Sequence, residues 1–181
     1  MNRPVQVDED EEVVLVDAED RPIGTLPKLA AHRTAARHRA FSVFLRDSDG
    51  NVLMQSRALT KYHSPGLWSN ACCGHPRTQE DVLDAARRRL AEEMGLDVTL
   101  RPVGKLNYSA ELADGWQENE VVHLFTGVTD AEPEPAAEEV HAWRRFSAAE
   151  LEAAARQDAD AFTAWFRIYL DEVPDVALGR S

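Results

Sequence analysis

Apolar and polar positions alternate along several short runs of the chain, and these runs predict strands. EVVLVDAEDRPIG begins with a short apolar run at residues 13–16 and ends in a turn. AFSVFLRDSDGNVLMQSRA, residues 40–58, places two β-rich runs on either side of DSDGN, which predicts a hairpin. Strand patterns return at 98–112 and 120–129, separated by the turn ADG, and HAWRRF at 141–146 is typical of a last strand.

A helical period replaces this alternation in three places. Over residues 80–94 the apolar side chains share one face, and Gly95 supplies a C-terminal stop. SAAELEAAARQ, residues 147–157, begins with Ser147 and has a glutamate three residues later, the pattern of a capping box. ADAFTAWFRIYL, residues 159–170, predicts a terminal helix. The order of strands, one helix, strands and helices predicts an α+β fold, with mixed β-sheets packed between α-helices in a single domain.

Two segments show no sustained period. Residues 60–79 contain two prolines and two glycines, so we expect a long loop there. Long loops inside compact domains are usually functional. EPEPAAEE, residues 132–139, is typical of a surface connector.

Length and charge narrow the possible functions. A chain of 181 residues is long enough for one full core, which we place at residues 13–170 between an acidic flexible tail at 1–12 and a frayed tail at 171–181. A net charge of −12 argues against a nucleic-acid partner, whereas an anionic small molecule stays possible where Lys and Arg gather. No secretory pattern and no apolar run of transmembrane length is present, so we expect a cytoplasmic protein without a membrane partner.

The helix at 80–94 carries a pattern of charges that ordinary packing does not require. Counting from Gly74, Glu80 lies six residues on, and RRLAEEMGL follows at 88–96. This arrangement resembles the Nudix box, except that Arg89 stands where Nudix hydrolases have a glutamate. Carboxylates one turn apart can hold a hard divalent cation, and an arginine in place of one of them removes a ligand and adds a phosphate clamp. The alternative is a solvated helix with i,i+4 ion pairs, such as the pair of Arg89 and Glu93.

Two i,i+2 pairs of polar residues lie in extended segments. Cys73 and His75 form one pair, and Glu118 and Glu120 form the other. In a strand the members of each pair face the same side. Glu120 opens the apolar run VVHLF, and a carboxylate drawn into a core is costly unless it is paired or bound to a metal.

A set of motifs together resembles one family. AAHRTAARHRAF, RALTK, PGLWSNACCGHP, the Nudix-like helix, ENE and TAWF occur in this order across about residues 13–170, as they do in type 1 isopentenyl-diphosphate delta-isomerases. The resemblance implies a Nudix-like fold and the interconversion of isopentenyl and dimethylallyl diphosphate. It also implies a small-molecule diphosphate substrate, no flavin, and a monomer or weak dimer.

The resemblance assigns roles to individual residues. One divalent metal (Mn²⁺, Zn²⁺ or Mg²⁺) is expected at His32, His38, His75, Glu118 and Glu120. The expected catalytic residues are Cys73 and Glu120, with Trp165 facing the carbocation and Tyr108 near the carboxylate. The diphosphate is expected at Lys28, Arg57, Lys61 and Arg89, with a Mg²⁺ held by Glu93 and the backbone carbonyl of Cys73.

Several residues are left outside this site. Alternation turns Cys72 away from Cys73, so we expect it to pack in the core. His123 sits in an apolar strand and is expected to be a core histidine with a partner, whereas His63 and His141 are expected at the surface. Two other functions stay open: a Nudix pyrophosphohydrolase acting on a nucleoside diphosphate derivative, and a binding module that keeps the fold without the chemistry.

Overall fold

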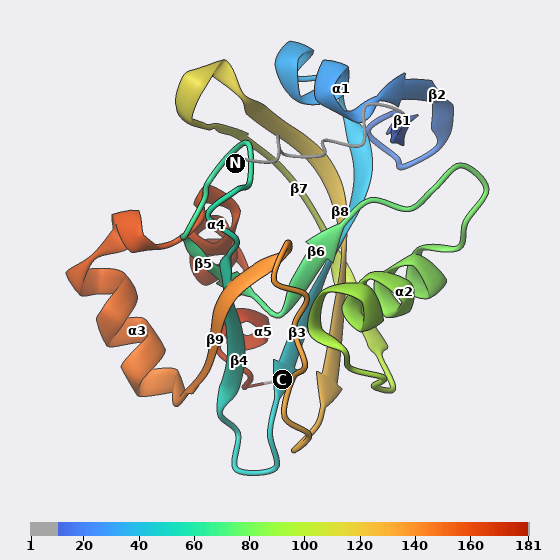
Figure 1. The fold of residues 1–181 in the computed structure, drawn as a ribbon. Helices are drawn as coiled ribbons and strands as arrows, with labels where there is room; N and C mark the ends of the chain where they lie inside the picture. The colour runs from blue at the N-terminus through green and yellow to red at the C-terminus, as the bar shows by residue number, and fades with distance from the viewer. Residues whose placement is uncertain (1–10, 181) are drawn as a thin grey trace, which may run out of the picture.

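The computed structural model describes residues 11–180, and Figure 1 shows its fold. Strands and helices alternate irregularly along the chain, with two short 3-10 turns labelled η. In chain order the elements are β1 (Glu12–Val16), β2 (Pro22–Pro27), α1 (Lys28–Thr34), β3 (His38–Arg46), β4 (Val52–Arg57), β5 (Trp68–Asn70), β6 (Cys72–Gly74), α2 (Val82–Met94), β7 (Arg101–Glu111), η1 (Ala113–Gly115), β8 (Gln117–Val128), β9 (Val140–Phe146), α3 (Ala148–Gln157), η2 (Ala159–Ala161), α4 (Ala164–Glu172) and α5 (Pro174–Ala177). No helix among the described residues is both long and apolar enough to cross a membrane.

Strand β3 is the centre of one mixed sheet. On one edge it pairs in parallel with β8, from His38 opposite Glu120 to Arg46 opposite Val128. On its other edge it pairs antiparallel with β1, β6 and β4 along its length. β7 continues the sheet beyond β8, and both β5 and β9 pair with β4 (Figure 1).

Successive side chains of β3 point to opposite faces of the sheet, so the strand contributes to two separate hydrophobic cores. Phe41, Val43 and Leu45 pack with the apolar face of α2. Ala40 and Phe44 pack on the opposite face of the sheet with α4 and α5. The sheet is therefore covered by helices on both sides, which confirms the predicted α+β fold with mixed strands between helices (Figure 1).

The local signals that predicted helices and the hairpin are confirmed. The hairpin forms from β3 and β4. The side chain of Asp81 caps α2 by accepting a hydrogen bond from the backbone N–H of Leu83 at 2.9 Å. Gly95 ends the helix with φ 65°, and a Cβ there would lie 2.7 Å from the carbonyl oxygen of Glu134, so only glycine fits. The capping box at Ser147 is also present.

Some predicted boundaries are wrong. Residues 60–79 are not a continuous loop, because β5 and β6 lie within them. The predicted helix at 159–170 starts only at Ala164, where Thr163 caps α4. The residues after 170 do not form a frayed tail: α4 continues to Glu172, α5 follows, and the side chain of Leu178 is 2% exposed. Of the expected acidic tail, residues 1–10 lie outside the described residues and Glu12 already belongs to β1.

Candidate active site and metal cluster

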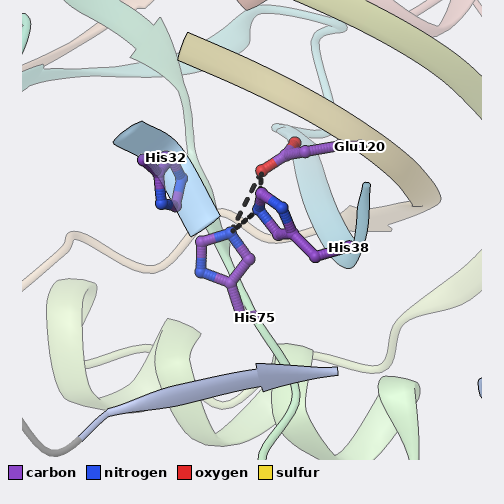
Figure 2. Close-up of side chains that lie close together, drawn as sticks. All are labelled: His32, His38, His75 and Glu120. Atoms are coloured by element: carbon purple, nitrogen blue, oxygen red, sulfur yellow. Dashed lines mark hydrogen bonds and ion pairs between the residues drawn. The ribbon is translucent and has the colours of Figure 1, made fainter. Parts of the chain in front are cut away.

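Three imidazoles and two carboxylates meet where α1, β3, β6 and β8 come together. His32 lies on α1 and His38 opens β3, while His75 directly follows β6. Glu118 and Glu120 lie two residues apart on β8. The side chains of all five are 8% exposed or less. Figure 2 shows His32, His38, His75 and Glu120 pointing toward one another. Their possible ligand atoms all lie within 4.8 Å of one another.

Backbone carbonyls fix the tautomers of two of these histidines. Nδ1 of His32 lies 2.8 Å from the carbonyl oxygen of Lys28, and Nδ1 of His38 lies 2.8 Å from that of Ala36. Because a carbonyl only accepts hydrogen bonds, each Nδ1 carries a proton. In the neutral rings, each Nε2 therefore presents a lone pair to the cluster.

These lone pairs point at other acceptors. Nε2 of His32 lies 3.1 Å from Oε2 of Glu118, an oxygen that has no hydrogen bond among the described residues. Nε2 of His38 lies 3.4 Å from Oε1 of Glu120 and 3.1 Å from Nε2 of His75. Burial acts to lower the pKa of His32, but its contact with Glu118 more than offsets this and raises it. Either a proton on His32 or a cation between these acceptors can therefore satisfy Glu118. Buried imidazole and carboxylate ligands, oriented by backbone carbonyls, fit one divalent metal ion.

The pKa values of the two carboxylates of the cluster are shifted in opposite directions. Burial acts to raise the pKa of Glu120, but the imidazoles of His38 and His75 more than offset this and hold it well below its ordinary value. Burial and the neighbouring charge of Glu120 raise the pKa of Glu118. Burial lowers the pKa of His75 to about 3. Glu120 is therefore the ionised carboxylate of the pair, and His75 is neutral.

Strand pairing also brings Cys73 and Tyr108 to this region. Cys72 packs in the core under α2, as predicted, whereas Cys73 packs on the other face of the sheet with the cluster that contains Trp165. The Tyr108 hydroxyl donates a 2.6 Å hydrogen bond to Oε2 of Glu120. Burial raises the pKa of Cys73 to about 12, and burial with the charge of Glu120 raises that of Tyr108 well above its ordinary value. Both groups therefore keep their protons at neutral pH.

Trp165 closes the apolar side of the same region. Its ring is 3% exposed, and its Nε1 donates a 2.8 Å hydrogen bond to Oγ of Ser69. The guanidinium of Arg57 lies 5.2 Å from the centroid of the ring and donates to the carbonyl oxygen of His63. The indole is thus held in one orientation beside a cation.

The other expected phosphate-binding cations are paired with carboxylates. Nζ of Lys28 lies 2.8 Å from Oε2 of Glu11. Lys61 forms an ion pair with Glu139, and the guanidinium of Arg89 lies 3.2 Å from the same carboxylate. The structure therefore brings Lys61 and Arg89 together, although the sequence separates them widely.

The Nudix-like helix contributes both structure and chemistry. Glu80 binds the guanidinium of Arg88 through both carboxylate oxygens, at 2.7 and 2.9 Å, and so ties the preceding loop to α2. Glu93 is buried and lies 2.6 Å from Arg89, so the i,i+4 ion pair of the alternative interpretation is present. Gln55 donates to the other oxygen of Glu93 at 3.0 Å. Glu93 can therefore serve as a metal ligand only by sharing or exchanging these partners.

Two residues differ from what the sequence indicated. His63 is not at the surface: it is 8% exposed, and its ring centroid lies 6.1 Å from that of His32 and 5.7 Å from that of Trp165. Glu139, expected in a surface connector, contacts two cations of the site instead. In the sequence, Glu139 is marked only by its position directly before β9. That position does not indicate its ion pair with Lys61, which lies 78 residues away.

The remaining histidines follow the prediction in part. His123 has the expected partner, a 2.8 Å contact with Asp20, but its side chain is 17% exposed and so is not in the core. His141 is exposed, as predicted.

Comparison with known proteins shows the family to which the chain belongs. The family model described as NUDIX domain matches residues 36–166. The chain is 48% identical to the isopentenyl-diphosphate Delta-isomerase of Burkholderia multivorans, over 90% of this chain and 92% of that protein. It is 44% identical to the Serratia proteamaculans protein of the same name, over 87% and 88%. The Streptomyces griseus protein of that name is 48% identical, over 87% of this chain and 80% of its own.

Solved structures share the fold at lower identity. A Deinococcus radiodurans crystal structure superposes with a TM-score of 0.67 at 20% identity, over 81% of this chain and 90% of that one. The MutT NUDIX hydrolase from Burkholderia pseudomallei gives a TM-score of 0.59 at 20% identity, over 76% and 98%. The fold is thus that of NUDIX proteins, and the relatives named above match nearly the whole chain. By these matches the chain belongs to the isopentenyl-diphosphate Delta-isomerase family of NUDIX-domain proteins.

Proposed function

We propose that this chain interconverts isopentenyl diphosphate and dimethylallyl diphosphate by protonation and deprotonation through a tertiary carbocation. The name shared by its curated relatives supports this activity. The observation that carries the proposal is the pairing of a protonated thiol with an ionised carboxylate. Cys73 is half-buried and packs with the same apolar cluster as Tyr108, whose hydroxyl contacts the buried Glu120. The pKa of the thiol is raised and that of the carboxylate is lowered.

Moving the double bond requires a proton donor and a proton acceptor. One proton must reach the terminal alkene carbon, and another must leave the allylic carbon at the other end of the unit. Cys73 and Glu120 are the proposed pair. Tyr108 holds Glu120 through its 2.6 Å hydrogen bond and offers a path for the proton.

The carbocation between the two steps needs stabilisation without a nucleophile. Trp165 is assigned to this role because its π-face can stabilise a cation by about 2 kcal/mol when water is excluded. The hydrogen bond from its indole to Ser69 fixes the ring, so little ordering is needed when substrate binds.

Two divalent cations are part of the proposal. His32, His38, His75, Glu118 and Glu120 would hold one of them, either Mn²⁺, Zn²⁺ or Mg²⁺, and the crowded acceptors described above fit that ion. Glu93 and the backbone carbonyl of Cys73 would hold a Mg²⁺ that accompanies the diphosphate. When bound, these ions supply positive charge that favours an ionised Glu120 and neutralises the phosphates.

Cationic side chains complete the diphosphate site. Lys28, Arg57, Lys61 and Arg89 are the proposed contacts. Arg89 stands where the hydrolase pattern has a metal-binding glutamate, so the site has one carboxylate fewer for the multi-metal centre that activates water. This difference supports isomerisation over hydrolysis.

The test is incubation of the protein with isopentenyl diphosphate and Mg²⁺, adding Mn²⁺ or Zn²⁺ in turn. Chromatography of the products and a free-phosphate assay are run on the same samples. We expect dimethylallyl diphosphate and no phosphate. Phosphate or isopentenyl monophosphate would indicate a hydrolase, and unchanged substrate with every metal would support a binding module.

A further inference from the structure

Glu139 lies between two of the cations assigned to the diphosphate. Its carboxylate pairs with Nζ of Lys61, and its Oε1 lies 3.2 Å from the guanidinium of Arg89. Lys61 belongs to the connection between β4 and β5, and Arg89 belongs to α2. The three side chains are 21–23% exposed, so they line a partly open surface. One carboxylate thus joins two distant segments of the chain.

The backbone of Glu139 is itself tied to both segments. Its carbonyl oxygen accepts a hydrogen bond from the N–H of Ala58 at 2.9 Å, three residues before Lys61. Its N–H donates to the carbonyl oxygen of Ala136, whose own N–H donates to the carbonyl oxygen of Glu93 on α2, both at 3.0 Å. The carboxylate therefore starts from a fixed point and cannot simply follow a moving lysine.

The two cations depend on Glu139 to different degrees. Arg89 also contacts Glu92 and Glu93, at 2.7 and 2.6 Å, and keeps these partners without Glu139. Lys61 has no other carboxylate partner in the part of the chain that the structure describes. Since like charges repel and a lysine side chain has many rotamers, loss of Glu139 frees Lys61 above all.

Two effects of Glu139 on an incoming diphosphate oppose each other. Its negative charge repels the anion, and water near this partly exposed group weakens the repulsion. Its hold on Lys61 means that the side chain is already ordered when the anion binds, which removes an entropic cost from binding. The backbone of Glu139 is fixed, and Glu139 is the one carboxylate partner of Lys61 among the described residues. Both facts favour the ordering of Lys61 over the repulsion of the anion.

We propose that Glu139 is a positioning residue of the diphosphate site, holding Lys61 beside Arg89 so that both meet the two phosphates; the inference rests on the proposed function. Glu139→Gln keeps the shape and removes the charge. The neighbouring Glu138→Gln is the matched control, because Glu138 is exposed and makes no contact with either cation among the described residues.

Calorimetric titration with inorganic pyrophosphate and Mg²⁺ is the direct experiment. We expect Glu139→Gln to weaken pyrophosphate binding about tenfold and to raise the KM for isopentenyl diphosphate by a similar factor, with kcat within twofold. Glu138→Gln should match the wild type. In a Lys61→Ala background, Glu139→Gln should weaken binding no further, since its partner is already gone.

The other outcomes are distinct. Equal or tighter pyrophosphate binding by Glu139→Gln would overturn the inference, because Glu139 would then only repel the anion. A loss of kcat and of melting temperature with unchanged KM would also overturn it, since that marks a purely structural role. No pyrophosphate binding by the wild type would contradict the diphosphate site itself, and with it the proposed function.

Discussion

Tyr108 and Glu120 face each other across the β7–β8 pair, and the phenol donates a 2.6 Å hydrogen bond to Oε2 of the carboxylate. The other oxygen, Oε1, lies 3.1 Å from Nε2 of His75 and 3.4 Å from Nε2 of His38. One oxygen is thus committed to the imidazoles and the other to the phenol. This division fixes the plane of the carboxylate, so Tyr108 orients the group that is proposed to carry the proton.

Tyr108→Phe removes that hydrogen bond and keeps the ring. We expect kcat to fall about 10- to 100-fold, less than for loss of an acid–base group itself, because Glu120 remains. The control is Tyr62→Phe, whose lost hydroxyl is buried and has no hydrogen bond within residues 11–180. That control should keep kcat within twofold and gain stability. Equal activity of the two variants in a steady-state assay would contradict the orienting role.

The adjacent cysteines allow a matched comparison. Cys73→Ala removes the proposed proton donor, and turnover should fall about 1,000-fold with little loss of stability. Cys72→Ala leaves a small cavity in the core under α2, where Cys72 is fully buried, so it should cost about 1–2 kcal/mol of folding free energy with turnover within threefold. Turnover and thermal unfolding are measured on both. The reverse pattern would mean that the two roles are exchanged.

Local patterns in the sequence account for much of the site. The helical period and the charges at fixed offsets identified α2, because a helix places such residues on one side whatever surrounds it. Strand alternation was equally informative: Glu118 and Glu120, two residues apart, both contact the histidines, and the neighbours Cys72 and Cys73 face opposite cores. The positions of the histidines came from the family resemblance, and the structure brings them within ligand distance of one another.

What the sequence did not reveal depends on contacts between distant segments. Glu139 reaches Lys61 only because the connector before β9 folds back over the β4–β5 connection. His63 is buried because β5 and β6 interrupt the expected loop and pull its remaining part against α4. Leu178 packs in the core, although it lies in the segment that was expected to be a frayed tail. None of these contacts leaves a periodic signal.

Metal binding to the histidine cluster should be visible as stabilisation, independently of activity. After chelation, Mn²⁺ at 100 times its dissociation constant should stabilise the wild type by about 2.7 kcal/mol, because the unfolded chain lacks the site. For a chain of this size that is a rise in Tm of roughly 5–10 °C. His75→Asn should lose at least half of this rise.

The control for this titration is His141→Asn, which removes an exposed histidine far from the cluster in sequence. It should keep the full rise in Tm. An undiminished rise in His75→Asn, measured by differential scanning fluorimetry, would show that the cluster is not where the metal binds.

A second charge cluster is expected to control stability in acid. The carboxylate of Asp20 contacts Arg39 and Lys105 at 2.6 Å and His123 at 2.8 Å. Burial acts to raise its pKa, but these hydrogen bonds more than offset this and hold it below 3.8. The stability that Asp20 contributes is therefore fully present above pH 3.8 and is lost as pH falls through the lower pKa of the folded state.

Asp20→Asn tests this contribution without disturbing the backbone, since asparagine tolerates the φ of 65° found there. At pH 7 we expect the free energy of unfolding to fall by about 2 kcal/mol. This value lies between those typical of breaking an exposed and a buried ion pair. The variant should also lose less stability than the wild type on further acidification. Asp49→Asn, at an exposed turn residue, is the control. Parallel acid profiles for Asp20→Asn and wild type in urea unfolding would refute the assignment.

The central claim is a proton exchange with solvent that leaves the diphosphate intact. It is tested most directly by NMR of isopentenyl diphosphate in D₂O with the wild-type protein, Mg²⁺ and Mn²⁺, beside Cys73→Ala. The account predicts dimethylallyl diphosphate with solvent deuterium in the methyl group formed from the terminal alkene carbon, no free phosphate, and product formation about 1,000-fold slower with Cys73→Ala. Product without deuterium, or phosphate released from the substrate, would contradict it.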